Sequence, residues 1–185
     1  MKRFNQVFAS RQSLVALALL AAMFSARAAD AVDVGEKLPD VAAVKEGLFP
    51  EEACKELEAA GFKCMGFKSA VRYSLPASSF KVGSAELPDS LRKQLDVFAE
   101  AMRGKKNTGR AVRVEGHADA SGTPEANLAL SQKRADAVKL YLIEKGTDPG
   151  LLEAVGMGAA APKVAGDPYA PANRRVEIGR QPAQP

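Results

Sequence analysis

The sequence is poor in the residues from which many enzyme sites are built. It has one histidine, two cysteines and no tryptophan among 185 residues. A metal site or an activated nucleophile would need further ligands or a partner base at a recognisable spacing, and the sequence offers none. We therefore expect no metal, no cofactor and no enzymatic activity.

Long apolar runs are also scarce. One run, from residue 14 to residue 24, follows Lys2, Arg3 and Arg11 and precedes the small residues Ala26 and Ala28. This pattern is typical of a signal peptide, here residues 1–28, with cleavage after Ala28. No later stretch approaches the length of about 20 apolar residues that crosses a bilayer. We expect an exported chain with no transmembrane segment after cleavage.

An excess of one charge is missing once that segment is removed. Four of the 26 basic residues and none of the 22 acidic residues lie in residues 1–28, so the remainder carries 22 of each sign. Nucleic-acid binding needs clustered excess positive charge. We expect no nucleic-acid partner.

The two cysteines lie in an N-terminal extension, residues 29–72. Its first residues predict a flexible lead or a peripheral strand, and a helix is expected from Pro50 to Ala60. Cys54 is on that helix and Cys64 follows it. In an oxidising compartment a disulfide is the expected pairing, contributing roughly 3 kcal/mol. A metal pair or a redox couple would need further ligands or a CxxC spacing.

Residues 112–143 join a strand, a polar turn and a helix. Val112 and Val114 alternate with polar residues up to Gly116, as in a half-buried strand. His117 and Asp119 therefore follow the carboxyl end of the strand, where ligand groups gather in open sheets.

The helix after this turn has clear boundaries and two distinct rows of residues. Thr123 is its expected N-cap, Pro124 its first residue, and Gly146 lies just after its end. A buried apolar stripe is predicted at Leu128, Ala135, Val138 and Leu142. A polar row, formed by Asn127, Ser131 and Arg134, is expected to face the end of the sheet.

The remaining elements complete a domain over residues 73–180. The stretch 73–82 should contain the first strand, with its proline at a sheet edge or at the strand's beginning. A helix follows with a buried face at four positions: Leu91, Leu95, Phe98 and Met102. Further strands are expected at 151–155 and 174–178, and residues 181–185 are an expected disordered tail.

These elements predict an α/β fold. The order is β-α-β-α-β-β, giving a sandwich with a mixed sheet of about four strands covered by two main helices. On the last strand, Arg174 shares the parity of Val176 and Ile178 and is expected to point inward. Arg175 and Glu177 are expected on a solvated face.

Several motifs in this order resemble one family. They are GHAD at 116–119, Gly122, Asn127, Leu130-Ser131, Arg134-Ala135, Val138, SAEL at 84–87, GMG at 156–158, Pro162 and NRRVEI at 173–178. The set resembles the OmpA-like peptidoglycan-binding domain, the C-terminal domain of outer-membrane protein A, whose pattern is GHTDxxGxxxxNxxLSxxRAxxV. The resemblance covers roughly the last 110 residues.

The resemblance implies noncovalent binding of peptidoglycan through the diaminopimelate residue of its stem peptide. It assigns the aspartate and the arginine of the pattern to Asp119 and Arg134, which can face the ammonium and the carboxylate of that residue. A structural ion pair between the two is the alternative. Ala118 replaces the family's threonine, so a hydroxyl that could bond ligand or loop is absent.

Four further residues are candidates beside this pair. Asn127 and Ser131 could donate to the ligand or only brace the helix start. His117 is expected to pack or brace the loop, with direct ligand contact as the alternative, and Arg174 is a secondary candidate.

The resemblance further implies a periplasmic, peptidoglycan-associated protein of a Gram-negative bacterium that anchors an envelope component to the wall. We expect a free form, because no cysteine at the cleavage site could carry a lipid and the extension has no room for a membrane barrel. The alternative is a periplasmic subunit of an envelope secretion or motility complex that docks a protein partner through residues 30–68.

Overall fold

The structure of the protein is a computed structural model that describes residues 31–66, 69–76, 80–81 and 83–181. The predicted signal peptide lies outside these residues. The elements in chain order are β1 (Ala31–Asp33), α1 (Val41–Leu48), α2 (Pro50–Ala59), β2 (Arg72–Pro76), α3 (Asp89–Met102), β3 (Val112–His117), α4 (Pro124–Glu144), η1 (Pro149–Leu151), β4 (Leu152–Gly156), η2 (Pro171–Asn173) and β5 (Arg175–Arg180).

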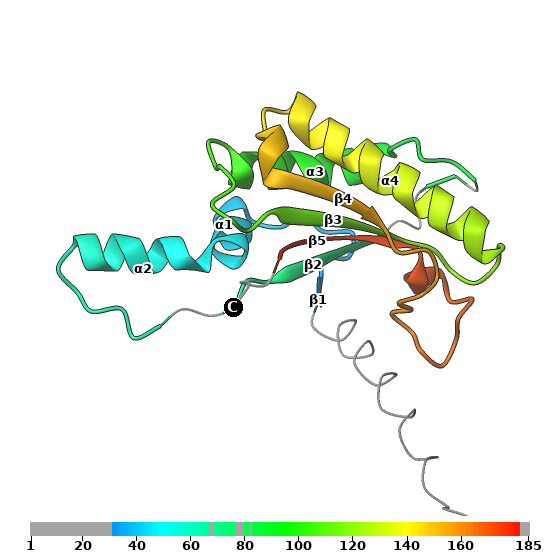
Figure 1. Cartoon of the computed structure of the whole chain (residues 1–185), viewed down its shortest axis with the longest axis horizontal. Coiled ribbons are helices and arrows are strands. Elements are labelled where there is room, and N and C mark those ends of the chain that lie inside the picture. Colours follow the sequence, from blue (N-terminus) through cyan, green and yellow to red (C-terminus); the bar gives the residue numbers. More distant parts are fainter. Residues whose placement is uncertain (1–30, 67–68, 77–79, 82, 182–185) are drawn as a thin grey trace, which may run out of the picture.

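The strands form one mixed sheet in the order β1-β2-β5-β3-β4 (Figure 1). The mixed α/β architecture is confirmed, and β1 adds a fifth strand to the expected four. β3 and β4 pair in parallel, and β5 lies antiparallel between β2 and β3. The first two strands of the domain are therefore not neighbours. The predicted place of the proline was wrong, because Pro76 ends β2, which is an inner strand flanked by β1 and β5.

Helices α3 and α4 cover one face of the sheet (Figure 1). The predicted stripe of α3 is confirmed, since all four of its residues are at most 1% exposed. On α4, Ala135, Val138 and Leu142 are buried, but the prediction for Leu128 was wrong because its side chain is 53% exposed. Leu128 lies near the start of α4, about one turn before Ser131 and Gln132, which contact β3 and β4 at Gly116 and Gly156.

The other face of the sheet carries charged side chains instead of a helical layer. Arg175 and Glu177 point to this face and are 1% and 2% exposed, so the predicted solvated face was wrong. The physical reason is mutual pairing: Arg175 Nε lies 2.6 Å from Glu177 Oε1, and Arg175 also donates to the carbonyl of Ala161 at 3.0 Å. Paired charges can be buried where single charges cannot.

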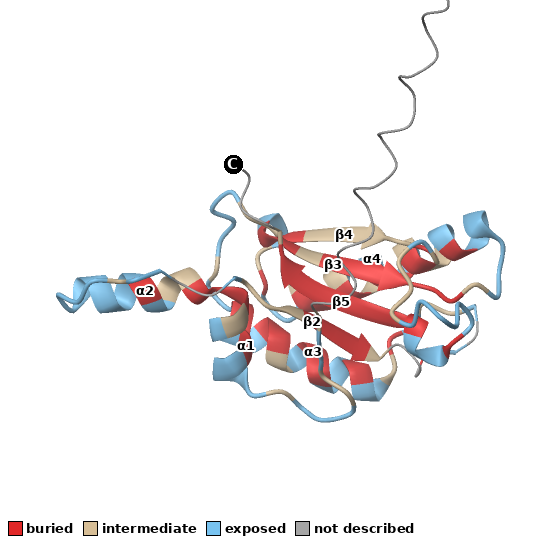
Figure 2. Cartoon of the chain, turned by 90° about the horizontal axis from the view of Figure 1, so that it is seen from below, coloured by how far each residue is buried: buried red, intermediate tan, exposed pale blue. Residues whose placement is uncertain are grey.

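The N-terminal extension contributes both to the body and to a projecting arm. β1 joins the sheet and α1, which was not predicted, packs against α3. The expected helix over 50–60 is α2, and the Cys54–Cys64 disulfide is confirmed. We call α2 together with residues 60–66 the arm. Figures 1 and 2 show α2 extending away from the sheet with most of its surface exposed.

The base of the arm is attached to the body by three side chains. Glu51 pairs with Arg180 of β5, and Glu52 pairs with Lys105 at 2.5 Å. The ring of Phe49, between α1 and α2, has the Arg180 guanidinium 4.9 Å and the Lys105 ammonium 5.6 Å from its centre. These cation–π contacts and ion pairs fix the start of α2.

Both edge strands of the sheet have few backbone groups free to pair with a further strand. β1 has three residues. Along β4, the side-chain amide of Gln132 on α4 accepts from Gly156 N at 2.6 Å and donates to Ala154 O at 3.3 Å. A side chain thus occupies backbone groups that a further strand would use.

Within the described residues, no helix has the length and apolar character needed to cross a membrane.

Candidate functional site

The candidate site is built where β3 meets α4. The chain leaves β3 at His117, and Thr123 caps α4 by accepting a hydrogen bond from Ala126 N at 3.2 Å. Gly116 permits this junction, because a Cβ placed there would lie 2.1 Å from the carbonyl oxygen of Ser131. The close contact between strand and helix backbones fixes the loop that carries Asp119.

Asp119 is 7% exposed and is held from two sides. Its Oδ1 accepts from Ser121 N at 3.1 Å, and its Oδ2 lies 2.5 Å from Nη1 of Arg174. Burial opposes ionisation, but the Arg174 guanidinium and the Ser121 amide outweigh it and lower the pKa of Asp119 below its ordinary value. Asp119 is therefore anionic at neutral pH.

Arg134 enters the same region from α4 and is 3% exposed. Its Nε donates to Ser84 O at 3.0 Å, and its guanidinium lies over the ring of Phe80 at 4.7 Å. Its terminal nitrogens form no hydrogen bond with the described residues. Burial and the nearby Arg174 lower its pKa, and Asp119 partly offsets this, so all three charges act on one another.

The expected alternative, an ion pair between Asp119 and Arg134, is not formed. Asp119 pairs with Arg174 instead, at a distance that permits a direct charge-assisted hydrogen bond. Arg174 lies just before β5, and its side chain is 35% exposed. Arg174, a secondary candidate from the sequence, is thus in direct contact with Asp119, a primary one.

Asn127 and Ser131 brace the site. The amide nitrogen of Asn127 donates to the carbonyls of Asp119 and Gly122, at 2.9 and 3.2 Å. The hydroxyl of Ser131 donates to Leu128 O and accepts from Gly158 N, both at 2.9 Å. These bonds join three segments of backbone around α4, and they correspond to the bracing alternative for both residues.

His117 points to the charged face of the sheet, where Glu115 and Glu177 are its charged neighbours. It is 2% exposed, and neither ring nitrogen has a hydrogen-bond partner among the described residues. Its Nε2 lies 3.7 Å from Glu115 Oε2 and 4.0 Å from Glu177 Oε1. This burial fits the packing role expected for His117.

His117, Glu115 and Glu177 are close enough to be considered as metal ligands, with candidate donor atoms within 4.8 Å of one another. Their carboxylates are already neutralised. Arg72 contacts both Glu115 and Glu177, which face each other on β3 and β5, and Arg175 pairs with Glu177. Two guanidinium charges therefore stand where a cation would be needed, and the donor set does not fit a metal.

Glu115 has the most strongly shifted carboxylate of this charged face. Its burial favours the neutral acid, but the neighbouring His117 and Arg72 outweigh burial and lower the pKa of Glu115 to about 2. The carboxylate stays ionised and unsuited to accept a proton near neutral pH. It serves as a fixed counter-charge for Arg72.

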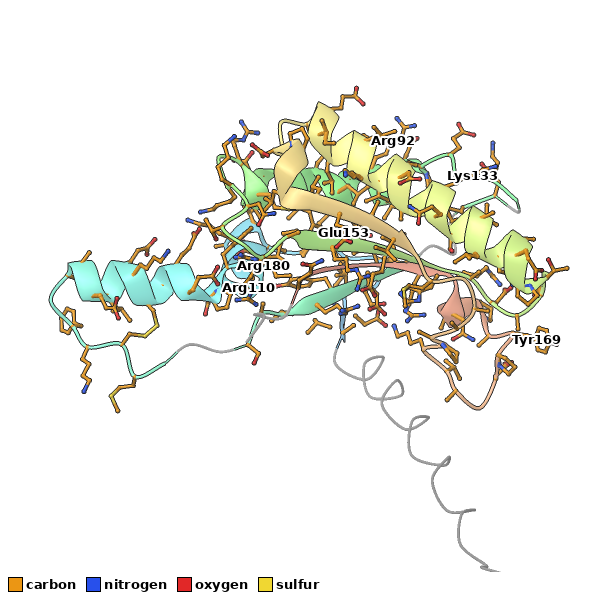
Figure 3. The ribbon with its side chains drawn as sticks, viewed as in Figure 1. Arg92, Arg110, Lys133, Glu153, Tyr169 and Arg180 are labelled. Atoms are coloured by element: carbon orange, nitrogen blue, oxygen red, sulfur yellow. A yellow bond between two sulfur atoms is a disulfide. The ribbon has the colours of Figure 1, made fainter. Side chains whose placement is uncertain are left out.

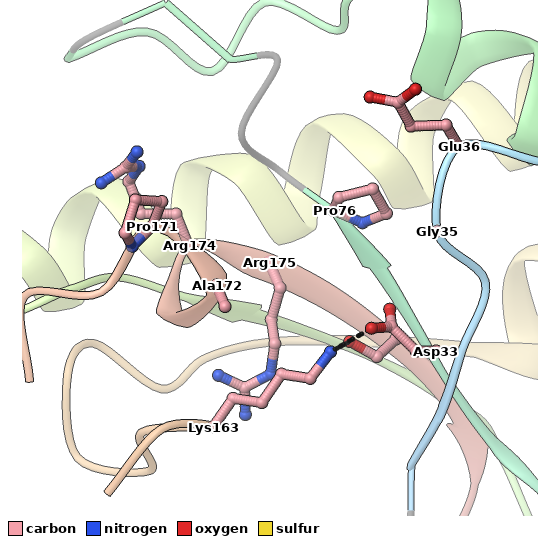
Figure 4. Close-up of a pocket in the computed structure, with 10 residues that line it drawn as sticks. Asp33, Gly35, Glu36, Pro76, Lys163, Pro171, Ala172, Arg174 and Arg175 are labelled. Atoms are coloured by element: carbon pink, nitrogen blue, oxygen red, sulfur yellow. Dashed lines mark hydrogen bonds and ion pairs between the residues drawn. The ribbon is translucent and has the colours of Figure 1, made fainter. Parts of the chain in front are cut away.

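A small pocket lies next to Arg174 on the side of β1. It has a volume of about 240 Å³ and is lined by Lys163, Arg174, Arg175, Asp33 and Glu36 among others (Figure 4). Lys163 donates to Asp33 at 2.8 Å, Arg174 pairs with Asp119, and Arg175 pairs with Glu177. Its three cations are thus already paired within the protein.

Sequence reasoning missed two residues of the site. Phe80 and Ser84 hold Arg134, although they are fifty residues or so away in the chain. Ser84 begins the SAEL string, which the sequence flagged only as part of a resemblance. Nothing in the local pattern indicates that its carbonyl meets an arginine of α4.

Comparison with known proteins decides the family. Residues 79–175 match the OmpA family. The chain belongs to the OmpA family. The matched segment contains Asp119, Arg134 and Arg174, and it excludes the arm.

Several relatives are named proteins of the cell envelope. The chain is 41% identical over 101 residues to the peptidoglycan-associated lipoprotein of Pseudomonas aeruginosa, covering 54% of this chain and 58% of that protein. It is 56% identical over 55 residues to the peptidoglycan-associated lipoprotein of Haemophilus influenzae, covering 30% and 36%. The chain therefore matches little more than half the length of the first relative.

A solved structure supports the fold. The periplasmic domain of Helicobacter pylori MotB (residues 97–256) superposes with a TM-score of 0.52 at 21% identity, over 61% of this chain and 83% of that chain. At this identity the likeness shows the architecture alone.

Proposed function

We propose that this protein binds peptidoglycan noncovalently through the diaminopimelate residue of the stem peptide and so anchors an envelope component to the cell wall. The observation that carries the proposal is the meeting of Asp119, Arg134 and Arg174 at one strand-to-helix junction within the family match. The side chain of diaminopimelate ends in an ammonium and a carboxylate on one carbon. An acid beside two bases provides both counter-charges.

Arg134 is the residue suited to the ligand's carboxylate. Its Nε and its ring contact hold the guanidinium in one plane, while the terminal nitrogens remain available for two parallel hydrogen bonds. Because the arginine is already fixed, little side-chain freedom is lost on binding.

Asp119 is the residue suited to the ligand's ammonium. In the unbound protein Arg174 occupies this carboxylate, so the ammonium must share Asp119 with Arg174 or replace it. Arg174 then becomes available to the ligand's carboxylate. With Arg134 and Arg174 both present, the ligand's carboxylate has two cationic partners and its ammonium has Asp119.

The proposal is for binding, not catalysis, at the wall of a Gram-negative periplasm. The peptidoglycan-associated lipoproteins among the relatives support it by name. The acids near the junction support it too, because Glu115 and Asp119 have lowered pKa values and are held by arginines. A general acid would need a raised pKa.

The test is retention on purified diaminopimelate-type cell wall. Asp119→Ala and Arg134→Ala should each abolish pull-down while circular dichroism shows a folded protein, since each removes one counter-charge of the zwitterion. Unchanged retention of either variant contradicts the site.

The chain offers matched controls on α3. Arg92 also donates its Nε to a backbone carbonyl and lies over a ring, that of Tyr141, and Asp96 also pairs with a cation, Lys145 at 2.9 Å. Arg92→Ala and Asp96→Ala remove the same kinds of contact at exposed positions away from the site. Both should keep full retention.

A second candidate function, docking of an envelope protein partner through residues 30–68, is favoured by the arm. Leu57, Phe62 and Met65 are 49%, 66% and 91% exposed, and a groove of about 560 Å³ lies between α1, α2 and the disulfide loop. Contiguous exposed apolar side chains often mark interaction surfaces. The wall site would then anchor a complex.

Mild crosslinking in cells followed by purification separates the two functions. Docking is supported if one specific protein is recovered with the unsubstituted chain but not with Leu57→Asp, while both are retained normally on the wall. Recovery of peptidoglycan alone from both proteins leaves wall binding as the function.

A further inference from the structure

Tyr169 differs from the other two tyrosines of the chain. Tyr73 and Tyr141 are each 8% exposed, and their hydroxyls donate to Ala43 O at 3.0 Å and to Asp96 Oδ1 at 2.9 Å. Tyr169 is 62% exposed, and its side chain forms no hydrogen bond or ring contact with the described residues. A large aromatic ring therefore stands in solvent without a structural task.

The backbone beneath this ring is firmly held. Tyr169 N donates to Asp167 Oδ1 at 3.0 Å, and the carbonyl of Asp167 accepts from Ala170 N and Asn173 Nδ2. These bonds close a tight turn just before η2. The ring is consequently presented from a fixed point, which lowers the entropy lost when it binds something.

The turn is joined directly to the loop of the candidate site. Ala120 N, next to Asp119, donates to the carbonyl of Pro168, next to Tyr169, at 2.9 Å. Figure 3 shows Tyr169 at the end of the molecule where α4 begins. The exposed ring thus borders the site that holds Asp119 and Arg174.

We propose that Tyr169 forms a carbohydrate subsite, in which its ring stacks on the pyranose of the glycan strand whose peptide occupies the Asp119 site. The inference rests on the proposed function. A pyranose presents one face of C–H groups, which an aromatic ring covers, while the phenol hydroxyl can bond a sugar hydroxyl or acetamido group. Tyrosine suits such a contact because it offers a large amphipathic surface with few rotatable bonds.

The dimensions of the polymer agree with this placement. The diaminopimelate is separated from the sugar by a short peptide that spans on the order of 10 Å when extended. Tyr169 follows a residue that is hydrogen-bonded to the neighbour of Asp119, and the ring reaches outward from there. One polymer unit can contact both places.

The experiment compares two ligands by isothermal titration calorimetry with the full chain. One is the tripeptide L-alanyl-γ-D-glutamyl-meso-diaminopimelate, and the other is the same tripeptide carrying N-acetylglucosaminyl-N-acetylmuramic acid. Tyr169→Ala should weaken binding of the disaccharide tripeptide about fivefold and leave the tripeptide unchanged. Tyr169→Phe should retain most of the affinity, because stacking survives.

Phe62→Ala is the matched control, because Phe62 is a similarly exposed aromatic residue on the arm. It should bind both ligands as the unsubstituted protein does. If Tyr169→Ala weakens both ligands equally, or neither, the carbohydrate subsite is overturned while the proposed function stands. If the unsubstituted protein binds neither ligand, both the proposed function and the subsite are overturned.

Discussion

The site at the start of α4 and the arm at the opposite end of the molecule are built in different ways. At the site, Asp119, Asn127 and Ser131 are held by hydrogen bonds. The elements there touch through their backbones, as at Gly116 against Ser131 and at Gly156 against Gln132. At the arm, apolar side chains are exposed. A disulfide closes its loop, and a few side-chain contacts attach it to the body.

The difference matches the boundary of the family. The match covers residues 79–175 and leaves out α1, α2 and the disulfide loop. The site end therefore lies within the family match, and the arm lies outside it. A destabilising substitution at the site end should therefore affect the whole sheet, whereas one in the arm should affect only the arm.

The same glycine substitution at the two ends tests this directly. Gly116→Ala should destabilise the fold by more than about 3 kcal/mol, because the new Cβ meets the backbone of α4, which cannot move alone. Gly61→Ala in the arm should cost about 1 kcal/mol, because the new Cβ meets nothing within 4 Å and only the positive φ of 86° opposes it. Urea denaturation measures both, and equal costs would remove the contrast.

The disulfide tests the arm without touching the site. Cys54→Ser should lower the free energy of unfolding by about 3 kcal/mol through the lost loop constraint. Wall retention should stay at the level of the unsubstituted protein. A folded variant that no longer binds the wall would show that the two ends are coupled. Calorimetry and pull-down on the same preparation provide both readings.

The charged face of the sheet offers a pH-dependent test at the site end. Glu115→Gln should lower stability by about 2 kcal/mol at neutral pH, since Arg72 loses a buried partner. The folded pKa is depressed, so the contribution of Glu115 is complete above about 4.5 and lost as pH falls towards about 2. The difference between variant and unsubstituted protein should shrink across that window in denaturation curves.

The ion pair at the base of the arm should have the smallest effect. Glu51→Gln should lower stability by about 1 kcal/mol, because Arg180 keeps its bond to Arg110 O and its contact with Phe49. Hydrogen exchange in α2 should rise while exchange in α4 stays the same. Faster exchange in α4 would contradict an independent arm.

Periodic patterns allowed much of the fold to be predicted. The α3 stripe ending at Met102, the cap of α4 at Thr123 and the turn at Gly146, whose φ is 98°, all follow from local spacing and backbone preference. The helix of the arm and its disulfide could be predicted for the same reason. These features depend on residues near one another in the chain.

The errors arose where distant residues decide the outcome. Arg175 and Glu177 look like a solvated strand face until Arg72, about a hundred residues earlier, is placed between Glu177 and Glu115. The ion-pair partner of Asp119 was mistaken for the same reason, because the sequence indicated Arg134 and the fold brings Arg174 to Asp119 instead. No periodicity encodes that β5 inserts between β2 and β3.

The amide of Gln132 on the outer edge of β4 has a consequence for molecules gathered on one polymer. Many copies held along the same surface would meet edge to edge at high local concentration, the condition under which open strands join into ribbons. Here a strand from another copy would first have to displace the Gln132 amide, which already bonds the backbone of β4 as a neighbouring strand would. Under the proposed function, crowding on the wall would raise occupancy without seeding aggregation.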